Sequence, residues 1–296
     1  MRSSILYNIT LAAFLARHVH SIALPAYTGL KTAQNGSILT VTFHNPSSPI
    51  NLWNQDTQDD LTDLVFRLQG DNETKVVIFN SDVPKFFMAH LDLTLPALAD
   101  PVFGEAFGTL IYNISQLSQV TIGAVEGRAR GAGNELLVSL DMRFATKGES
   151  LFGQPEVGSG LFPGGGGSQF LPGLIGRGRA MEYVLSSNDI TAEDAAEIGW
   201  INKAFDTSTE MYSYIDKLAQ RFSWFPLSAL SGGKKTINRA SAPSLEQIIA
   251  DTKDFFKQQF NPAVQAIAKK SAQLSRNASA VDLELNLPET ITRLYT

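Results

Sequence analysis

The sequence predicts an α/β fold that ends in a helical region. Strand-like runs rich in β-branched residues alternate with stretches of helical apolar spacing as far as Phe205. This alternation indicates parallel strands joined by right-handed crossovers. Beyond Phe205, helical spacing continues without a convincing strand. We therefore expect a core over residues 24–205 and a helical region over 206–296 that belongs to the same domain.

The elements of the core are expected in three strand–helix cycles. Strands are expected where β-branched and apolar residues run together, at 37–43, 75–79, 120–125 and 143–145. Helices are expected where apolar residues recur at three- and four-residue intervals, at 52–68, 103–117 and 133–140. A loop is expected at 81–94. The same spacing predicts C-terminal helices at 210–222, 227–239, 245–260 and 262–274.

The composition excludes several classes of function. The chain has 296 residues, of which 44% are apolar and 18% charged, as in ordinary globular proteins. A net charge of −5 without a basic block argues against nucleic acid as a partner. The absence of cysteine excludes disulfides, thiolate catalysis and Cys-type zinc sites. Histidines and carboxylates do not cluster at the spacing of metal ligands, so we expect no metal.

Residues 1–23 predict a cleaved leader. An apolar run at 9–16 is followed by small residues near Ala23, as in a secretory signal peptide. Five N-x-S/T sequons support secretion: Asn8, Asn35, Asn72, Asn113 and Asn277. Arg2, Arg17 and the lack of an acidic residue before Asp56 also suit a mitochondrial presequence, so that alternative stays open. The run is too short to span a bilayer, and we expect no membrane span.

Four segments have a composition suited to a ligand site, at 85–93, 126–135, 152–156 and 163–169. In α/β sheets, ligands bind beyond the carboxyl ends of strands. A Gly-rich turn that opens a helix offers free N–H groups to a phosphate or to a developing oxyanion. The phosphate interpretation is disfavoured, because neither a P-loop nor dinucleotide-binding spacing is present. Each glycine cluster alone is better explained by a tight turn or by close helix packing.

Glu135 and Glu156 are the ionisable residues of interest in these segments. Two carboxyl groups with differently tuned pKa values can perform acid–base chemistry at a carbonyl. Taken singly, either one is better explained as a helix cap or as a partner in a surface ion pair. A serine triad is disfavoured, because there is no G-x-S-x-G motif and two of the four histidines, His18 and His20, fall in the leader.

Four segments of the sequence resemble the motifs of a known family. The likeness is densest from Ile122 to Phe205 and extends back to about Ser37. Gly131–Leu136 is similar to the family's G-G-G-C-E-L, Phe152–Glu156 matches F-G-Q-P-E, Pro163–Leu171 resembles P-G-A-G-G-T-Q-R-L, and Lys85–Leu93 resembles K-A-F-A-A-G-A-D-I. The chain is thereby identified as a member of the crotonase (enoyl-CoA hydratase/isomerase) superfamily.

The resemblance implies a ClpP/crotonase-type core of repeated ββα units with a C-terminal helical trimerisation region, in a homotrimer or hexamer. It implies an acyl-CoA substrate, with coenzyme A as part of that substrate and no separate cofactor. The N–H groups of Leu91 and Ala132 would form an oxyanion hole. Glu135 would activate water and Glu156 would protonate the α-carbon, which favours syn hydration of a 2-enoyl thioester. Substrate contacts are expected from Lys85, Phe87, Ala89, His90, Gly131, Pro163 and Gly164.

Three residues depart from the family pattern. His90 stands where the family has a glycine, Ala132 replaces the middle glycine of the turn, and Phe170 stands where arginine is usual. A Cβ at the first two positions requires a negative φ. His90 motivates an alternative crotonase reaction, such as isomerisation, thioester hydrolysis or C–C cleavage, and is equally explained as a histidine satisfied within its loop. Together with a secretory leader, the altered residues motivate a third hypothesis, a non-catalytic secreted protein.

Overall fold

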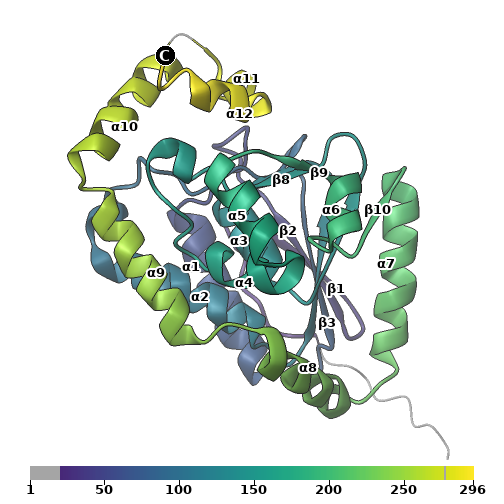
Figure 1. The fold of residues 1–296 in the computed structure, drawn as a ribbon. Helices are drawn as coiled ribbons and strands as arrows, with labels where there is room; N and C mark the ends of the chain where they lie inside the picture. Colours follow the sequence, from purple (N-terminus) through teal and green to yellow (C-terminus); the bar gives the residue numbers. More distant parts are fainter. Residues whose placement is uncertain (1–20, 277) are drawn as a thin grey trace, which may run out of the picture.

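The computed structural model describes residues 21–276 and 278–296, which form two sheets with helices around them (Figure 1). The main sheet has six strands in the order β1-β2-β3-β5-β7-β10. Its first pair is an antiparallel hairpin and its remaining pairs are parallel. The bounds are β1 Leu30–Asn35, β2 Ile38–Phe43, β3 Val76–Ser81, β5 Val120–Val125, β7 Met142–Thr146 and β10 Lys203–Phe205.

A second, smaller sheet has the order β4-β6-β8-β9. Its strands are β4 Phe86–Met88, β6 Arg128–Arg130, β8 Leu151–Gly153 and β9 Ile190–Thr191. The first three are parallel to one another, and β9 is antiparallel to β8. Each of β4, β6 and β8 follows one main-sheet strand (β3, β5 or β7) and precedes a helix. The core is therefore built of successive ββα units, and the expected fold class is confirmed.

Alternate residues of the main sheet face two different helical layers, as the two-residue period of a strand requires. Val76 and Ile78 of β3 pack in one cluster with Met211 and Ile215 of α7 (Ser208–Ser223). The intervening residues belong to the large core, which also includes residues of α1 (Gln55–Gly70) and α2 (Pro101–Ser115). The main sheet thus lies between α7 and the layer that carries the site.

The remaining helices surround the two sheets. They are α3 Ala132–Ser139, α4 Gly167–Ile175, α5 Arg177–Ser186, α6 Ala192–Ile198, α8 Leu227–Ser241, α9 Leu245–Gln258, α10 Pro262–Ser275, α11 Ala280–Leu285 and α12 Leu287–Thr292. Helix α8 packs against β5, and α9 packs on α2. Gly104 and Gly108 of α2 lie against Phe256 and Thr252 of α9, so the two helices approach closely.

We refer to α10, α11 and α12 together as the C-terminal cap. Figure 1 shows α10 leading away from α9, with α11 and α12 lying beside the end of the molecule that carries β8 and β9. No helix of the described residues is long and apolar enough to cross a membrane. Most of the predicted leader (residues 1–20), with its sequon at Asn8, and the sequon at Asn277 lie outside the described residues.

Candidate active site

Three of the predicted site segments leave neighbouring parallel strands at one edge of the second sheet. Met88 pairs with Ala129, and Arg130 pairs with Gly153, which aligns the carboxyl ends of β4, β6 and β8. The residues that follow these ends are His90, Gly131 and Glu156. Because the strands are adjacent and parallel, segments far apart in the sequence converge at this edge.

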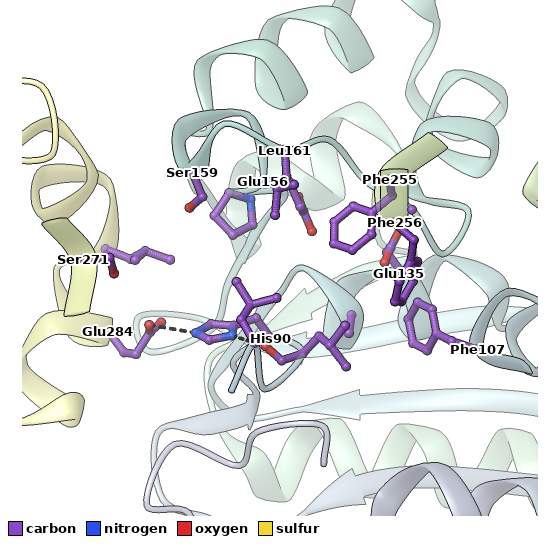
Figure 2. A pocket seen from close by; sticks show the side chains of 16 residues that line it. His90, Phe107, Glu135, Glu156, Ser159, Leu161, Phe255, Phe256, Ser271 and Glu284 are labelled. Carbon is purple, nitrogen blue, oxygen red and sulfur yellow. Dashed lines mark hydrogen bonds and ion pairs between the residues drawn. The ribbon is translucent and has the colours of Figure 1, made fainter. Parts of the chain in front are cut away.

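A cavity of about 150 Å³ lies at this edge (Figure 2). Six predicted site residues line it: His90, Leu91, Ala132, Glu135, Glu156 and Gly164. The other lining residues are Leu93, Phe107, Pro155, Ser159, Leu161, Phe255, Phe256, Ser271, Glu284 and Leu287. The cavity is therefore lined by three carboxyl groups, those of Glu135, Glu156 and Glu284, between largely apolar walls.

The N–H group of Leu91 has no hydrogen-bond acceptor within the described residues and points away from the neighbouring segment, which contains Trp53. His90 accepts a hydrogen bond on its carbonyl from the Trp53 N–H at 2.9 Å, and the Asp92 N–H donates to the Trp53 carbonyl at 3.0 Å. In an extended residue the N–H and C=O groups share one side, so those of Leu91 face away from Trp53. Within the described residues the Leu91 N–H donates to no other group. It remains available to a ligand.

The N–H of Ala132 is free for a different reason. Ala132 is the first residue of α3, where N–H groups have no partner within the helix and the helix dipole is positive. Gly131 before it has φ 48°, and a Cβ there would lie 3.0 Å from Glu156 Oε1 and 3.2 Å from the His90 Cβ. His90 and Ala132 are not among the described residues with positive φ. Both therefore meet the condition under which a residue with a Cβ can replace the glycine of the family pattern.

Glu135 is held by backbone donors inside the cavity. Its Oε1 accepts hydrogen bonds from the Gly165 N–H at 2.6 Å and the Gly167 N–H at 3.1 Å. Burial raises the pKa of the carboxyl, the two backbone donors oppose that rise, and Asp251 adds to it, giving a pKa of about 7. Because Gly167 is the first residue of α4, Glu135 caps that helix from α3, so the helix-cap explanation holds together with a place in the cavity.

Glu156 faces the same cavity without such support. Its Oε2 is buried and has no hydrogen-bond partner among the described residues. Burial and the neighbouring Glu135 raise the pKa of Glu156 well above its ordinary value, and His90 opposes the rise only in part. The two carboxyl groups therefore differ in environment: Glu135 can carry a charge on its donors, and Glu156 favours a proton.

His90 has an acceptor at each ring nitrogen. Nδ1 lies 2.7 Å from the Leu91 carbonyl oxygen, and Nε2 lies 3.1 Å from Glu284 Oε1, as Figure 2 shows. Burial lowers the pKa of His90, but the Glu284 carboxylate, the Leu91 carbonyl and Glu156 outweigh burial and raise the pKa to about 9. Both nitrogens can donate at once only in the imidazolium form. We therefore describe His90 as a cation at the cavity wall.

The other predicted substrate contacts lie outside the cavity wall. Phe87 packs edge-on against Phe43 in the core, with ring centroids 5.4 Å apart, and Ala89 is buried. Pro163 is buried beside Gly167. Lys85 is exposed, and its backbone packs against Gly127. Gly131 does not line the cavity but touches both His90 and Glu156.

The sequence reasoning did not single out the walls that come from distant helices. Phe107 of α2 and Phe255 and Phe256 of α9 form one apolar side, and the cap contributes Ser271, Glu284 and Leu287. The only sequence signal for the aromatic wall was an apolar helical stripe, which also describes ordinary core. Glu284 carried no signal, because its importance depends on contacts with residues more than 150 positions away.

No group of three or more His, Cys, Asp or Glu residues that could hold a metal occurs in the described part of the chain. The chemistry open to the site consists of two amide donors, two carboxyl groups with different pKa values and an apolar pocket. Such a set can polarise a carbonyl oxygen and move protons on either side of it.

Comparison with known proteins places this geometry in one family. A profile described as enoyl-CoA hydratase/isomerase matches residues 33–273. A short-chain-enoyl-CoA hydratase of Clostridium acetobutylicum is 30% identical over 77% of this chain and 88% of its own length. A crotonyl-CoA hydratase of Syntrophomonas wolfei is 32% identical over 72% of this chain and 80% of its own length.

Solved structures agree with the sequence relatives. A provisionally assigned enoyl-CoA hydratase of Streptomyces avermitilis is 36% identical, has a TM-score of 0.83, and is matched over 91% of this chain and 99% of its own. The sequence resemblance, the repeated ββα units and the profile over most of the chain agree. The chain belongs to the enoyl-CoA hydratase/isomerase family of the crotonase superfamily.

Proposed function

We propose that the protein is an enoyl-CoA hydratase that adds water in syn fashion to a 2-enoyl thioester. The observation that carries the proposal is the presence of Glu135, Glu156 and the free N–H groups of Leu91 and Ala132 around one cavity. Relatives that share about 30% of the sequence are named as hydratases of short-chain enoyl-CoA and crotonyl-CoA. Coenzyme A enters as part of the substrate.

In the proposed reaction the thioester oxygen accepts hydrogen bonds from the Leu91 and Ala132 amides, which stabilise enolate character. Glu135 takes a proton from water as the water oxygen bonds to the β-carbon. Glu156 delivers its proton to the α-carbon, so the water and the double bond become a 3-hydroxyacyl thioester. The assignment follows the pKa directions, because the better supported carboxylate is the base and the carboxyl that favours a proton is the acid.

The acyl group is proposed to be uncharged. The apolar wall beside the carboxyl groups consists of Phe107, Leu161, Phe255 and Phe256, which offer no partner to a charged acyl group (Figure 2). His90, the one cation of the wall, is already paired with Glu284. Crotonyl-CoA is therefore the substrate of choice for the first assay.

Kinetics of glutamine variants test the proposal. Glu135→Gln and Glu156→Gln are each expected to lower kcat for crotonyl-CoA hydration by about 100- to 10,000-fold, the usual contribution of a positioned acid or base. Glu149→Gln is the matched control, since Glu149 is exposed and pairs with Arg128 away from the cavity. Turnover at the wild-type level in both cavity variants would overturn the proposal.

The alternative crotonase reactions, motivated by His90, are less well supported. A role for His90 as base requires a free ring nitrogen, whereas each nitrogen faces an acceptor of the protein. A panel of 2-enoyl, 3-enoyl and 3-oxoacyl thioesters separates the reactions. We expect hydration to be the fastest conversion. A faster isomerisation or thioester cleavage that His90→Gly abolishes would favour the alternative, and no measurable acyl-CoA binding in calorimetry would favour the non-catalytic hypothesis.

The compartment and the oligomer remain predictions. A Dictyostelium discoideum relative, 27% identical over 77% of this chain, carries a provisional name as a mitochondrial enoyl-CoA hydratase, which supports the mitochondrial form of the leader prediction over the secretory one. N-terminal sequencing of the mature protein, together with its glycan status, decides between them. Light scattering tests the homotrimer or hexamer.

A further inference from the structure

The C-terminal cap meets the second sheet through a buried ionic cluster. Arg130 at the end of β6 has no exposed surface and forms a two-point pair with Asp189, at 2.8 and 2.5 Å. Its remaining nitrogen donates to the backbone carbonyl of Glu284 at 2.5 Å and lies 3.5 Å from Glu284 Oε2. A guanidinium fixed by Asp189 thus anchors α11 by both its backbone and its side chain.

Glu284 connects this anchor to the oxyanion segment. Its other oxygen, Oε1, lies 3.1 Å from His90 Nε2, and the His90 ring contacts the carbonyl of Leu91 at 2.7 Å with its second nitrogen. The Leu91 carbonyl and N–H belong to the same extended residue. A ring that holds the carbonyl therefore also fixes the direction of the N–H.

The apolar contacts of α11 are limited. Val281 and Leu285 pack, only partly buried, on a small cluster made by Ile50, Phe86 and Ala89. This cluster is separate from the large core. Glu284, by contrast, is 7% exposed and is the one residue of α11 that is buried. The seating of α11 consequently depends on its ionic contacts to an unusual degree.

We propose that Glu284 is a positioning residue for the reaction: by pairing with His90 and Arg130 it seats α11 and keeps the Leu91 N–H aimed at the acyl oxygen. The inference rests on the proposed function. It assigns to α11 an indirect part in the oxyanion hole and to His90 a role as connector instead of base. The positive charge of His90 and the negative charge of Glu284 cancel, so this part of the cavity wall presents no net charge to the substrate.

The groups that face His90 limit the pH range over which it can contact both Glu284 and Leu91. Glu284 approaches from α11, Glu156 from the loop after β8, and the Leu91 carbonyl from the segment after β4. Arg130 of β6 faces Glu284 from the other side. When His90 loses one proton, a single N–H remains for two acceptors. Above about pH 9 we therefore expect the contact to Glu284 or to Leu91 to break, with a looser α11 and lower activity.

The test combines amide hydrogen exchange with kinetics on the full chain. Glu284→Ala is expected to raise the exchange rate over residues 281–285 at least tenfold. It is also expected to lower kcat for crotonyl-CoA by about 10- to 100-fold, because a displacement of roughly 1 Å at the reacting centre can cost on the order of 100-fold. Glu284→Gln keeps the size of the side chain. Its exchange rate and its kcat are expected to lie between those of the wild type and those of Glu284→Ala. Glu289→Ala, on the exposed side of α12, is the matched control for both readouts.

Two further results would each be decisive. The alkaline decline of kcat near pH 9 is expected in the wild type and absent in Glu284→Ala, a difference that mere loss of stability would not produce. Faster exchange with unchanged kcat overturns the positioning role, and unchanged exchange overturns the seating of α11 by Glu284. A wild-type protein that hydrates no enoyl-CoA refutes the proposed function, whereas the exchange experiment still decides whether Glu284 holds α11.

Discussion

Substitution of Gly133 by alanine should separate the two amides of the site while leaving their residues intact. Gly133 is the second residue of α3 and lies directly against the backbone of β4. A Cβ on Gly133 would sit 2.7 Å from the Met88 Cβ and even closer to the Met88 carbonyl oxygen, whereas ordinary contact begins at 3.4 Å. Since φ is not positive here, the effect is steric and not conformational.

The magnitude follows from the overlap. To relieve the contact with the Met88 Cβ alone, α3 has to move from β4 by about 0.7 Å. Ala132 moves with α3, and Leu91 stays with the segment after β4, so the distance between their N–H groups increases by a similar amount. An error of roughly 1 Å costs on the order of 100-fold, and loss of one oxyanion donor costs about 100- to 1000-fold. We expect kcat to fall by about 10- to 100-fold, with an overpacking cost of roughly 1–3 kcal/mol in stability.

Steady-state hydration of crotonyl-CoA and thermal unfolding, measured side by side, check this expectation. Gly232→Ala is the control, because Gly232 is exposed within α8 and a Cβ there meets nothing within 4 Å. The control should keep full activity and gain up to about 1 kcal/mol, since alanine is the better helix former. A Gly133→Ala protein with wild-type kcat would refute the reasoning, because it would show that the spacing of the two segments does not matter.

The remaining predictions concern charge and buried hydrogen bonds. Because the folded state raises the pKa of Glu135 from 4.5 to about 7, the protonated form stabilises the fold, and this contribution is complete below pH 4.5 and lost as pH rises through 7. Glu135→Gln, with its lowered kcat, should therefore be more stable than the wild type at pH 8, by on the order of 3 kcal/mol, and equally stable at pH 4, as judged by denaturant unfolding. Equal stability of the two proteins at both pH values would contradict the raised pKa. The indole N–H of Trp200 donates to Asn134 Oδ1 at 3.0 Å, and Asn134→Ala leaves this buried donor without a partner. The free energy of unfolding, followed by tryptophan fluorescence, should fall by roughly 1–3 kcal/mol. The control Asn188→Ala, at an exposed position, should lower the free energy of unfolding by less than half as much. A larger loss for Asn188→Ala than for Asn134→Ala would contradict the contribution of the buried Asn134–Trp200 hydrogen bond.

Four of the six main-sheet strands could be predicted from the sequence because they are rich in β-branched and apolar residues, whereas the largely polar β1 and the three-residue β10 were not expected. The strand expected at 120–125 is observed as Val120–Val125, and those expected at 37–43 and 75–79 end within two residues of the observed ends. The four C-terminal helices from α7 to α10 were located within two residues at each end. Periodicity over five or more residues is a strong signal for buried elements.

The second sheet could not be predicted in the same way. β4, β6 and β8 have three residues each, too few to show a period, and the segment that holds β4 was expected to be a loop. These strands exist because they pair with one another side by side, which is a long-range property. The site residues were nevertheless found, because the glycine turns and glutamates around them resemble a family motif. The resemblance contained nothing about Glu284, whose partners His90 and Arg130 lie in the second sheet and its edge.

A crystal structure of the protein with a non-reactive acyl-CoA analogue tests the central claim most directly. We predict a thioester oxygen within about 2.7–3.1 Å of both the Leu91 and the Ala132 nitrogen atoms, the range of an oxyanion hole. The acyl chain should run toward Phe107 and Phe256, with the Glu135 and Glu156 carboxyl groups on the same face of the reacting carbons, as syn addition requires. A thioester oxygen that contacts neither amide, or an analogue bound outside this cavity, would contradict the account.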